Sequence, residues 1–287
     1  MRISKTVGLC LLCFVQSAHA QTTNSSSTTA PPSKAAVPQV PKFLTSPFDS
    51  TVSSLPPNFQ GHDIEKIYDA IKRLNIKPKS EFETLNDYNQ RLKSFSNQLI
   101  LERLTLSSTF AVVLRKVSKS LSSFSVAYDA EGQIMTISIA PFSGSFIEPQ
   151  IAESMGEVER MDLKTNFLSR GKYAARSALG VNVQIKRMEL HTFGVIVTNV
   201  ESNTTGLKRD FAIPMAPEQA RRLKSDLRVL LICELRQPWI RTDKISVEPT
   251  IDSPIDVTET WNYLDISVQE VWIFVLPSGE IIKKFRE

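Results

Sequence analysis

The sequence predicts an α+β fold in which amphipathic helices come first and a mainly antiparallel β-sheet follows. Between residues 62 and 99, apolar side chains recur at the three- and four-residue spacing of a helix. From about Leu106 onward, segments rich in Val, Ile, Phe and Tyr alternate with turn residues, as strands joined by short hairpins do. One further helical stretch, 217–227, interrupts these strands.

The first 20 residues have the features of a secretory signal peptide. Arg2 and Lys5 precede the apolar run VGLCLLCFV, and Ala18 and Ala20 are the small residues that signal peptidase requires before the cut. We therefore expect cleavage after Ala20 and an exported mature chain, periplasmic or secreted. No later apolar run reaches the roughly 18 to 20 residues of a transmembrane helix, so we expect no membrane insertion.

Charge and cysteine content argue against several classes of protein. The chain has a formal net charge of +4 at pH 7, and losing Arg2 and Lys5 with the signal leaves 32 basic and 30 acidic side chains. Such a balance gives no general attraction to nucleic acid, and we expect none as a partner. Cys233 is the one cysteine left after cleavage, and its apolar run LRVLLICEL predicts a buried thiol rather than a nucleophile. An apolar core must then hold the fold.

Residues 21–57 predict a disordered tether. Ser, Thr and Pro make up 21 of these 37 positions. Such a composition buries too little apolar surface to offset the entropy that is lost on ordering. We expect the tether to hold the folded region, 58–287, away from a surface or partner. Asn24 and Asn203 lie in N-x-S/T sequons, which matter only in a source that glycosylates exported proteins.

The first helix is predicted within HDIEKIYDAIKRL, residues 62–74, and Asn75 and Pro78 end it. Its apolar positions form one stripe: Ile64, Ile67, Tyr68, Ile71 and Leu74. This stripe predicts a helix that packs one side against a core. The helical part of the folded region extends to residue 105, so 58–105 is a candidate subdomain.

The second helix is predicted to begin within KSEFETLNDYNQRL, residues 79–92. Thr84 is suited to be the N-cap, and Asp87 stands three positions later, where an acid can close the cap. Asp87 and Arg91 are expected to form an i,i+4 ion pair. The predicted apolar face consists of Phe82, Leu85, Tyr88, Leu92, Phe95 and Leu99.

The predicted strands share a high content of β-branched and aromatic residues. They are TFAVVLRKV, SFSVAYDAEGQIMTISI, GVNVQIKRMELHTFGVIVTN, RDFAIPM, LRVLLICEL and VWIFVLPSGEIIKKF. Turn residues at 129–132 and 277–280 predict hairpins. We interpret Trp272, in the apolar run VWIFVL, as a core residue rather than a sugar-stacking one. The sheet-rich part, 106–287, is a candidate second subdomain.

Two blocks of sequence carry a resemblance to known proteins. The first consists of Lys79, Glu81, Phe82, Glu83, Thr84, Tyr88 and Arg91. It resembles a K-x-E-F-E-T-x-x-x-Y-x-x-R pattern of uncharacterised exported bacterial proteins. The second, GKYAARSALG at 171–180, resembles another block of that family, with Ser177 where Asn is usual and Leu179 where Phe is usual. The resemblance implies a bacterial periplasmic location and brings no known activity with it.

Few residues are suited to nucleophilic or metal catalysis. The mature chain retains His62 and His191, neither near a second ligand in sequence, and no CxxC, HExxH, GxSxG or glycine-rich phosphate loop occurs. We therefore expect no catalytic, cofactor-binding or metal-binding residue and no cofactor. The stretch TIDSPIDVTETW holds Asp252, Asp256 and Glu259, which we interpret as a solvated acidic loop rather than a cation site.

The clearest candidate for a partner site is the segment 171–180. Lys172, Tyr173 and Arg176 lie there, in an expected loop with glycines at both ends, between a helical stretch and a strand. Such a loop could hold an anionic ligand or an envelope protein. The alternative is that it only turns the chain into the sheet.

Together these features predict an exported, non-enzymatic, envelope-associated binding or structural module. The alternative is a hydrolase that cleaves cell-wall or polysaccharide substrates with paired carboxylates, either Glu81 with Glu83 or Asp252 with Asp256. A cleft that held two carboxyl oxygens about 5 to 10 Å apart would favour the hydrolase.

Overall fold

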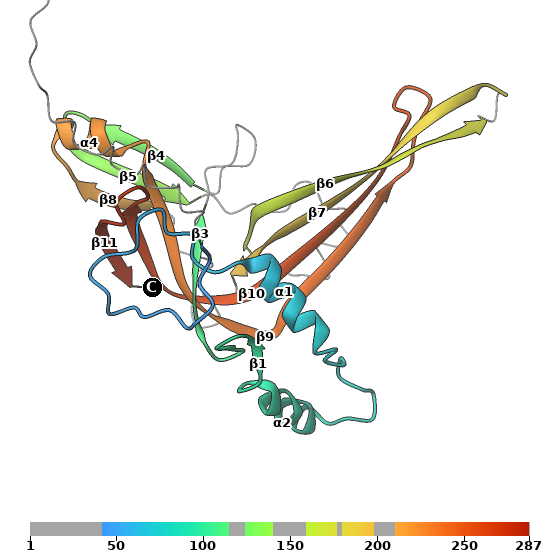
Figure 1. Ribbon diagram of the computed structural model, residues 1–287, viewed down its shortest axis with the longest axis horizontal. Coiled ribbons are helices and arrows are strands. Elements are labelled where there is room, and N and C mark those ends of the chain that lie inside the picture. The colour runs from blue at the N-terminus through green and yellow to red at the C-terminus, as the bar shows by residue number, and fades with distance from the viewer. Residues whose placement is uncertain (1–41, 115–123, 140–158, 177–179, 198–209, 287) are drawn as a thin grey trace, which may run out of the picture. The chain divides into compact units, whose positions relative to one another are not determined.

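The computed structural model describes residues 42–114, 124–139, 159–176, 180–197 and 210–286 (Figure 1). All of them belong to one compact unit, Val40–Glu287, with no boundary near residue 105. The predicted signal peptide and both sequons, at Asn24 and Asn203, lie outside the described residues.

Of the described residues, 57% lie in strands and 14% in helices, and the sheets are mostly antiparallel, which is compatible with the predicted α+β class. The largest sheet has six strands in the order β3-β9-β10-β7-β6, with β11 also paired to β10. Its strands are β3 (Thr109–Leu114), β6 (Glu159–Arg176), β7 (Asn182–Val197), β9 (Leu227–Val247), β10 (Ile255–Val275) and β11 (Ile281–Arg286).

Strand β10 is the centre of this sheet. It pairs antiparallel with β9 over almost its whole length. On its other side it pairs first in parallel with β7, from Ile255 to Ile266, and then antiparallel with β11, from Glu270 to Phe274. One continuous strand therefore belongs both to the part of the sheet beside β11 and to the part beside β7 and β6 (Figure 1).

Two clusters of buried apolar residues form the core, and β3, β9 and β10 contribute to both. Trp272 is fully buried among Phe48, Phe59 and Phe274, and its indole N–H donates to the Glu270 carboxylate at 2.7 Å. The interpretation of Trp272 as a core residue is confirmed. Cys233 is likewise fully buried, and burial raises the pKa of its thiol, as expected for a small hydrophobe rather than a nucleophile.

Helix α1 (Ile64–Arg73) begins at Asp63, whose carboxylate accepts the Lys66 N–H. Four residues of the predicted stripe are buried: Ile64, Ile67, Tyr68 and Ile71. The Tyr68 ring packs edge-on against Phe193 of β7, and its hydroxyl is hydrogen-bonded to Thr242 of β9. The helix therefore covers one face of the large sheet.

Helix α2 (Leu85–Phe95) begins at Thr84, as predicted, because the Thr84 side chain accepts the Asp87 N–H at 3.1 Å. Its predicted apolar face is wrong in part. Leu92 is buried, whereas Phe82 is 90% exposed and Leu85 65% exposed. The predicted face extends beyond the helix, because Phe82 precedes the N-cap residue Thr84. At the other end, Leu99 lies in the short strand β1 (Leu99–Leu101), which pairs with β2 (Leu104–Thr105).

Residues 42–57, expected to be part of the tether, pack onto the sheet instead. The Phe48 N–H donates to Thr109 of β3, and the Leu55 N–H donates to Gly279. Both Phe48 and Leu55 are buried in the cluster that contains Trp272. The prediction of a tether that ends at Pro57 is therefore wrong for this stretch, because a few apolar side chains in a Ser/Thr/Pro-rich segment suffice to anchor it.

The remaining strands form a three-stranded antiparallel sheet in the order β4-β5-β8. It consists of β4 (Phe124–Asp129), β5 (Ile134–Ile139) and β8 (Asp210–Pro214). The predicted hairpin turns are confirmed at 129–132, between β4 and β5, and at 277–280, between β10 and β11. Helix α4 (Pro217–Leu223) follows β8, with Ala216 as N-cap and Pro217 in its first turn, and it ends four residues before the predicted end.

Candidate functional site

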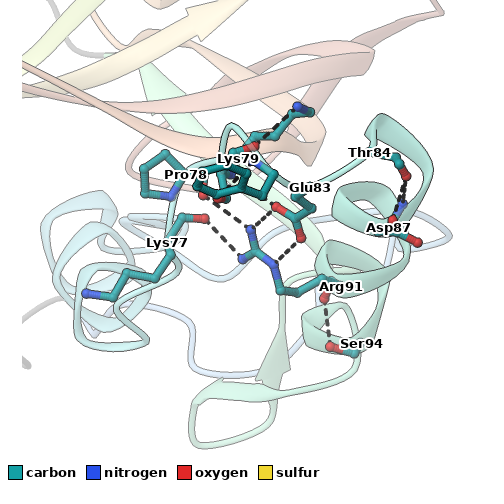
Figure 2. Close-up of polar contacts among 10 residues, drawn as sticks. Lys77, Pro78, Lys79, Glu83, Thr84, Asp87, Arg91 and Ser94 are labelled. Atoms are coloured by element: carbon teal, nitrogen blue, oxygen red, sulfur yellow. Dashed lines mark hydrogen bonds and ion pairs between the residues drawn. The ribbon is translucent and has the colours of Figure 1, made fainter.

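The first part of the segment that resembles the family pattern, residues 79–83, forms a loop bound to α2 (Figure 2). Arg91 donates to both carboxylate oxygens of Glu83, at 2.8 and 2.9 Å. The same guanidinium donates to the carbonyl oxygens of Lys77 at 3.1 Å and Pro78 at 3.3 Å. A planar, five-donor group thus ties the loop to the helix through a bidentate pair and two backbone contacts.

The predicted Asp87–Arg91 ion pair is replaced by the Glu83–Arg91 pair. The Thr84 hydroxyl donates to the Asp87 carboxylate at 2.6 Å, so Asp87 is used within the cap (Figure 2). Glu83, on the loop, presents both oxygens to the guanidinium, a stronger geometry than a single i,i+4 contact between flexible side chains.

Glu83 is therefore a poor candidate for a catalytic acid. Its hydrogen bonds with Arg91 lower the pKa of the Glu83 carboxyl, whereas a general acid at neutral pH needs a raised pKa. Glu81, its partner in the proposed carboxylate pair, lies on the exposed loop. A hollow of about 500 Å³ lies beside them, lined by Lys77, Pro78, Ser80, Phe82, Glu83, Asp87 and Arg91.

The expected loop at 171–180 is wrong in its first part. Gly171 to Arg176 belong to β6 and pair with β7, while 177–179 lie outside the described residues. Gly171 has a φ of +85° and occupies a bulge between Ser169 and Lys172. The long partner strand β7 holds this stretch extended, although its own sequence has little β-propensity.

The three predicted partner-binding residues separate onto two faces of the sheet, because neighbouring side chains of a strand point to opposite faces. The Tyr173 hydroxyl donates to Asp256 of β10 at 3.3 Å, beside Arg187, which donates to the same oxygen at 3.1 Å. Lys172 and Arg176 lie on the opposite face. The Arg176 side chain also donates to the Gly180 carbonyl at 3.1 Å.

Asp256 and Glu259, expected in an acidic loop, lie within β10, where the cross-strand partners in β7 and β9 override the polar local sequence. Asp252 precedes the strand and is exposed. The second carboxylate pair proposed for the hydrolase therefore divides between a loop and a strand. Asp256 is bound to Arg187, as Glu83 is to Arg91.

Four strands continue side by side beyond the part of the sheet that α1 contacts (Figure 1). We call this the four-strand section: residues 165–176 of β6, 182–192 of β7, 241–247 of β9 and 255–261 of β10. Contacts with α1 identify its first face. Glu65 of α1 accepts hydrogen bonds from Lys164 and from Asn166 of β6, the latter at 3.1 Å. We call this side the helix face.

The opposite side, the open face, has an apolar centre. The register aligns Val247, Val257 and Met188 in one row across the strands, and Ile245, Glu259, Leu190 and Phe167 in the next. Because paired residues point to the same face, these side chains lie together. The apolar members of the face are Phe167, Met188, Leu190, Ile245, Val247, Ile255, Val257 and Trp261.

All eight of these apolar side chains are exposed or partly exposed. Phe167 is 67% exposed and Val247 50% exposed. Glu259 stands among them, and burial, followed by the charge of Asp162, raises the pKa of its carboxyl. An apolar sheet face of this kind is ordinarily covered by another layer.

A buried polar cluster lies on the same face, toward the core. The Tyr263 hydroxyl donates to Asp162 at 2.8 Å, and the Arg160 guanidinium lies 5.9 Å from the Tyr263 ring centroid. Arg241 donates twice to one oxygen of Asp265, at 2.8 and 3.1 Å. Burial raises the pKa of the Asp162 carboxyl. This cluster is not predicted from the sequence, although the charged residues within the apolar stretches YLDISV and RMDLKT are a signal of buried polar contacts.

The histidines have structural contacts. His62 is buried, its Nδ1 accepts the Ala111 N–H at 2.9 Å, and its Nε2 lies 2.9 Å from the Ser46 carbonyl. His191 lies 3.6 Å from Glu189, which also binds Arg170. Among the residues that the structure describes, no group of three or more His, Cys, Asp and Glu side chains is arranged to hold a metal ion.

Within the described ranges, each of the helices is too short or too polar to cross a membrane. No protein-family model, curated protein or solved structure matches this chain.

Proposed function

We propose that the protein is an exported, non-enzymatic, envelope-associated binding module, in which two amphipathic helices precede a mainly antiparallel sheet. The observation that carries the proposal is the open face of the four-strand section. Its apolar side chains come from four different strands and are brought together by the register. A contiguous exposed apolar face of this kind is typical of a protein–protein interaction site.

The alternating exposure of successive residues along β9 supports a binding surface on the open face. Along β9, Arg241, Asp243 and Ile245 are half-buried, whereas Thr242 and Lys244 between them are exposed. This alternation of exposure is expected for a strand with one more solvated and one more covered face. The helix face carries charged side chains that already pair with one another, so the open face is the side on which we expect a partner.

Basic residues lie at one end of the open face, and two of them were predicted from the sequence to bind a partner. Lys172 and Arg176 of β6 share this face with Lys186 of β7. We propose that these three cations contact acidic groups of the protein partner at the rim of the apolar surface. Tyr173, on the helix face, acts by holding β6 to β10 through Asp256.

The contacts of the candidate carboxylates support a non-enzymatic function rather than that of a hydrolase. Glu83 and Asp256 are each bound to an arginine, and the hydrogen bonds with Arg91 lower the pKa of the Glu83 carboxyl. The signal-like first 20 residues and the family resemblance support an envelope location.

Site-specific photo-crosslinking in exporting cells tests the proposal. A photoreactive amino acid at Val257 projects from the open face, whereas the same group at Thr258, the next residue of β10, projects from the helix face. We expect covalent protein adducts from position 257 and far fewer from position 258. Equal yields at the two positions, or none at 257, would contradict the proposed binding surface.

A further inference from the structure

The charges on the open face are arranged unevenly along the strands. Toward its outer end, one row carries Lys172, Lys186 and Ile255, with Arg176 further out on β6, and the next row inward is apolar, with Met188 and Val257. The third row contains Glu259 among apolar residues, and the fourth contains Asp243 beside Trp261. Positive charge thus lies on one side of an apolar centre and negative charge on the other.

We propose that the open face binds the open face of a second copy of this chain, with the strands of the two copies antiparallel. This inference rests on the proposed function, because it names the partner of the same surface. A two-fold axis that crosses the strands at the Val257 row places the lysine row of each copy over the Glu259 row of the other. Lys186 of one copy then lies over Leu190 of the second copy, and Glu259 on the neighbouring strand β10, about 4.8 Å to the side, is within reach of the lysine side chain.

A two-fold axis parallel to the strands is disfavoured by charge. An axis parallel to the strands would set each row against the same row of the second copy, so that the basic row with Lys172 and Lys186 would face the basic row of the second copy. Like charges opposed across an interface cost several kcal/mol. The antiparallel arrangement instead pairs opposite charges around an apolar centre, where Val257 and Met188 of each copy meet their equivalents.

The helix face is less suited to this role. Its charged residues already bind one another, as Arg170 binds Glu189 and Arg187 binds Asp256. By contrast, desolvation of Glu259 among apolar neighbours is a cost that an incoming lysine would offset. The same cost would remain if an uncharged apolar partner covered this surface.

The area of the face predicts a weak dimer. Four strands spaced about 4.8 Å apart and about 20 Å long give roughly 400 Å² for each copy. The total, roughly 800 Å², is below the roughly 1,200 Å² at which specific, stable interfaces begin. We therefore expect a micromolar or weaker dissociation constant and a reversible monomer–dimer equilibrium.

Sedimentation velocity of the signal-free chain over micromolar to millimolar concentrations tests the inference. Wild type should shift from monomer to dimer, and Val257→Glu should remain monomeric. Thr258→Glu, with the same change on the opposite face of the same strand, should dimerise as wild type does. Circular dichroism and thermal melting of each variant establish that it is folded.

A charge exchange tests the antiparallel arrangement. Lys186→Glu and Glu259→Lys should each raise the dimer dissociation constant about tenfold, and the double variant should recover most of the loss. A double variant no better than the singles would overturn the arrangement. If wild type stays monomeric at every concentration, the proposal that a second copy is the partner is wrong. Adducts at position 257 with a different protein would then still support the proposed function, whereas their absence would remove both.

Discussion

The contact of His62 with the segment before it offers a quantitative test of the fold. The His62 ring joins Ser46, within the stretch expected to be a tether, to Ala111 of β3. Replacing His62 by Phe keeps a ring of similar size and removes both hydrogen bonds. The buried Ala111 N–H would lose its partner, at a cost of about 1–3 kcal/mol, and the partly exposed Ser46 carbonyl would lose about 0.5–1.5 kcal/mol. We expect a total loss of about 1.5–4.5 kcal/mol.

The pH dependence of the same contact has a definite sign. Burial lowers the pKa of His62 below its ordinary value of about 6.5. Above that value neither the folded nor the unfolded chain protonates this histidine, and the stabilisation is complete. As the pH falls from about 6.5 toward the lowered pKa, the unfolded chain alone binds the proton. Stability should then decrease by up to about 1.4 kcal/mol per pH unit.

Urea unfolding of wild type and His62→Phe between pH 7.5 and pH 5 measures both effects. The difference between the two curves isolates His62, because contributions from Glu259 and Asp162, whose pKa values burial raises, are present in both proteins. The difference should be largest at pH 7.5 and shrink as the pH falls. Equal stability at pH 7.5, or a difference that does not change with pH, would refute the assigned role of His62.

Two further substitutions test the helix start and the packing beneath the polar cluster. Thr84→Ala should lower the free energy of unfolding by about 0.5–2 kcal/mol through loss of the N-cap. Ser94→Ala, on the exposed side of the same helix, is the control, and an equal effect of the two would contradict the cap. Gly194→Ala should destabilise by about 1–3 kcal/mol, because its Cβ would lie 2.3 Å from the Met161 carbonyl oxygen and 2.9 Å from the Tyr263 ring. Unchanged thermal stability of Gly194→Ala would show that β6 and β7 can separate there.

The strands that could be predicted are those with an unambiguous local signal. Apolar runs bounded by turn residues, such as LRVLLICEL and the two hairpins, correspond to strands of the structure. Strand β6 was missed because KTNFLSRGKYAAR has no sustained alternation and contains Gly171. Its extended form depends on pairing with β7, and such tertiary stabilisation is not visible in one segment.

The candidate surface was only partly predictable. The alternation in IRTDKISV and IDVTETW is a strand signal, but acidic residues favoured the interpretation of a loop around Asp256. The joining of Phe167, Leu190, Glu259 and Ile245 into one row depends on register among four strands far apart in the chain. Lys172 and Arg176 were identified from charge, whereas the separation of Tyr173 from them required the strand geometry.

The change of neighbour along β10 has a mechanical consequence. A pull on the outer end of the four-strand section, directed along its strands, would be carried by β10 past Ile266 into the buried stretch around Trp272. The hydrogen bonds between β9 and β10 run across the strands, so such a load would act on many of them in shear rather than opening them one at a time. A load along the strands would therefore reach the core before the hydrogen bonds that join the section to the core break one by one.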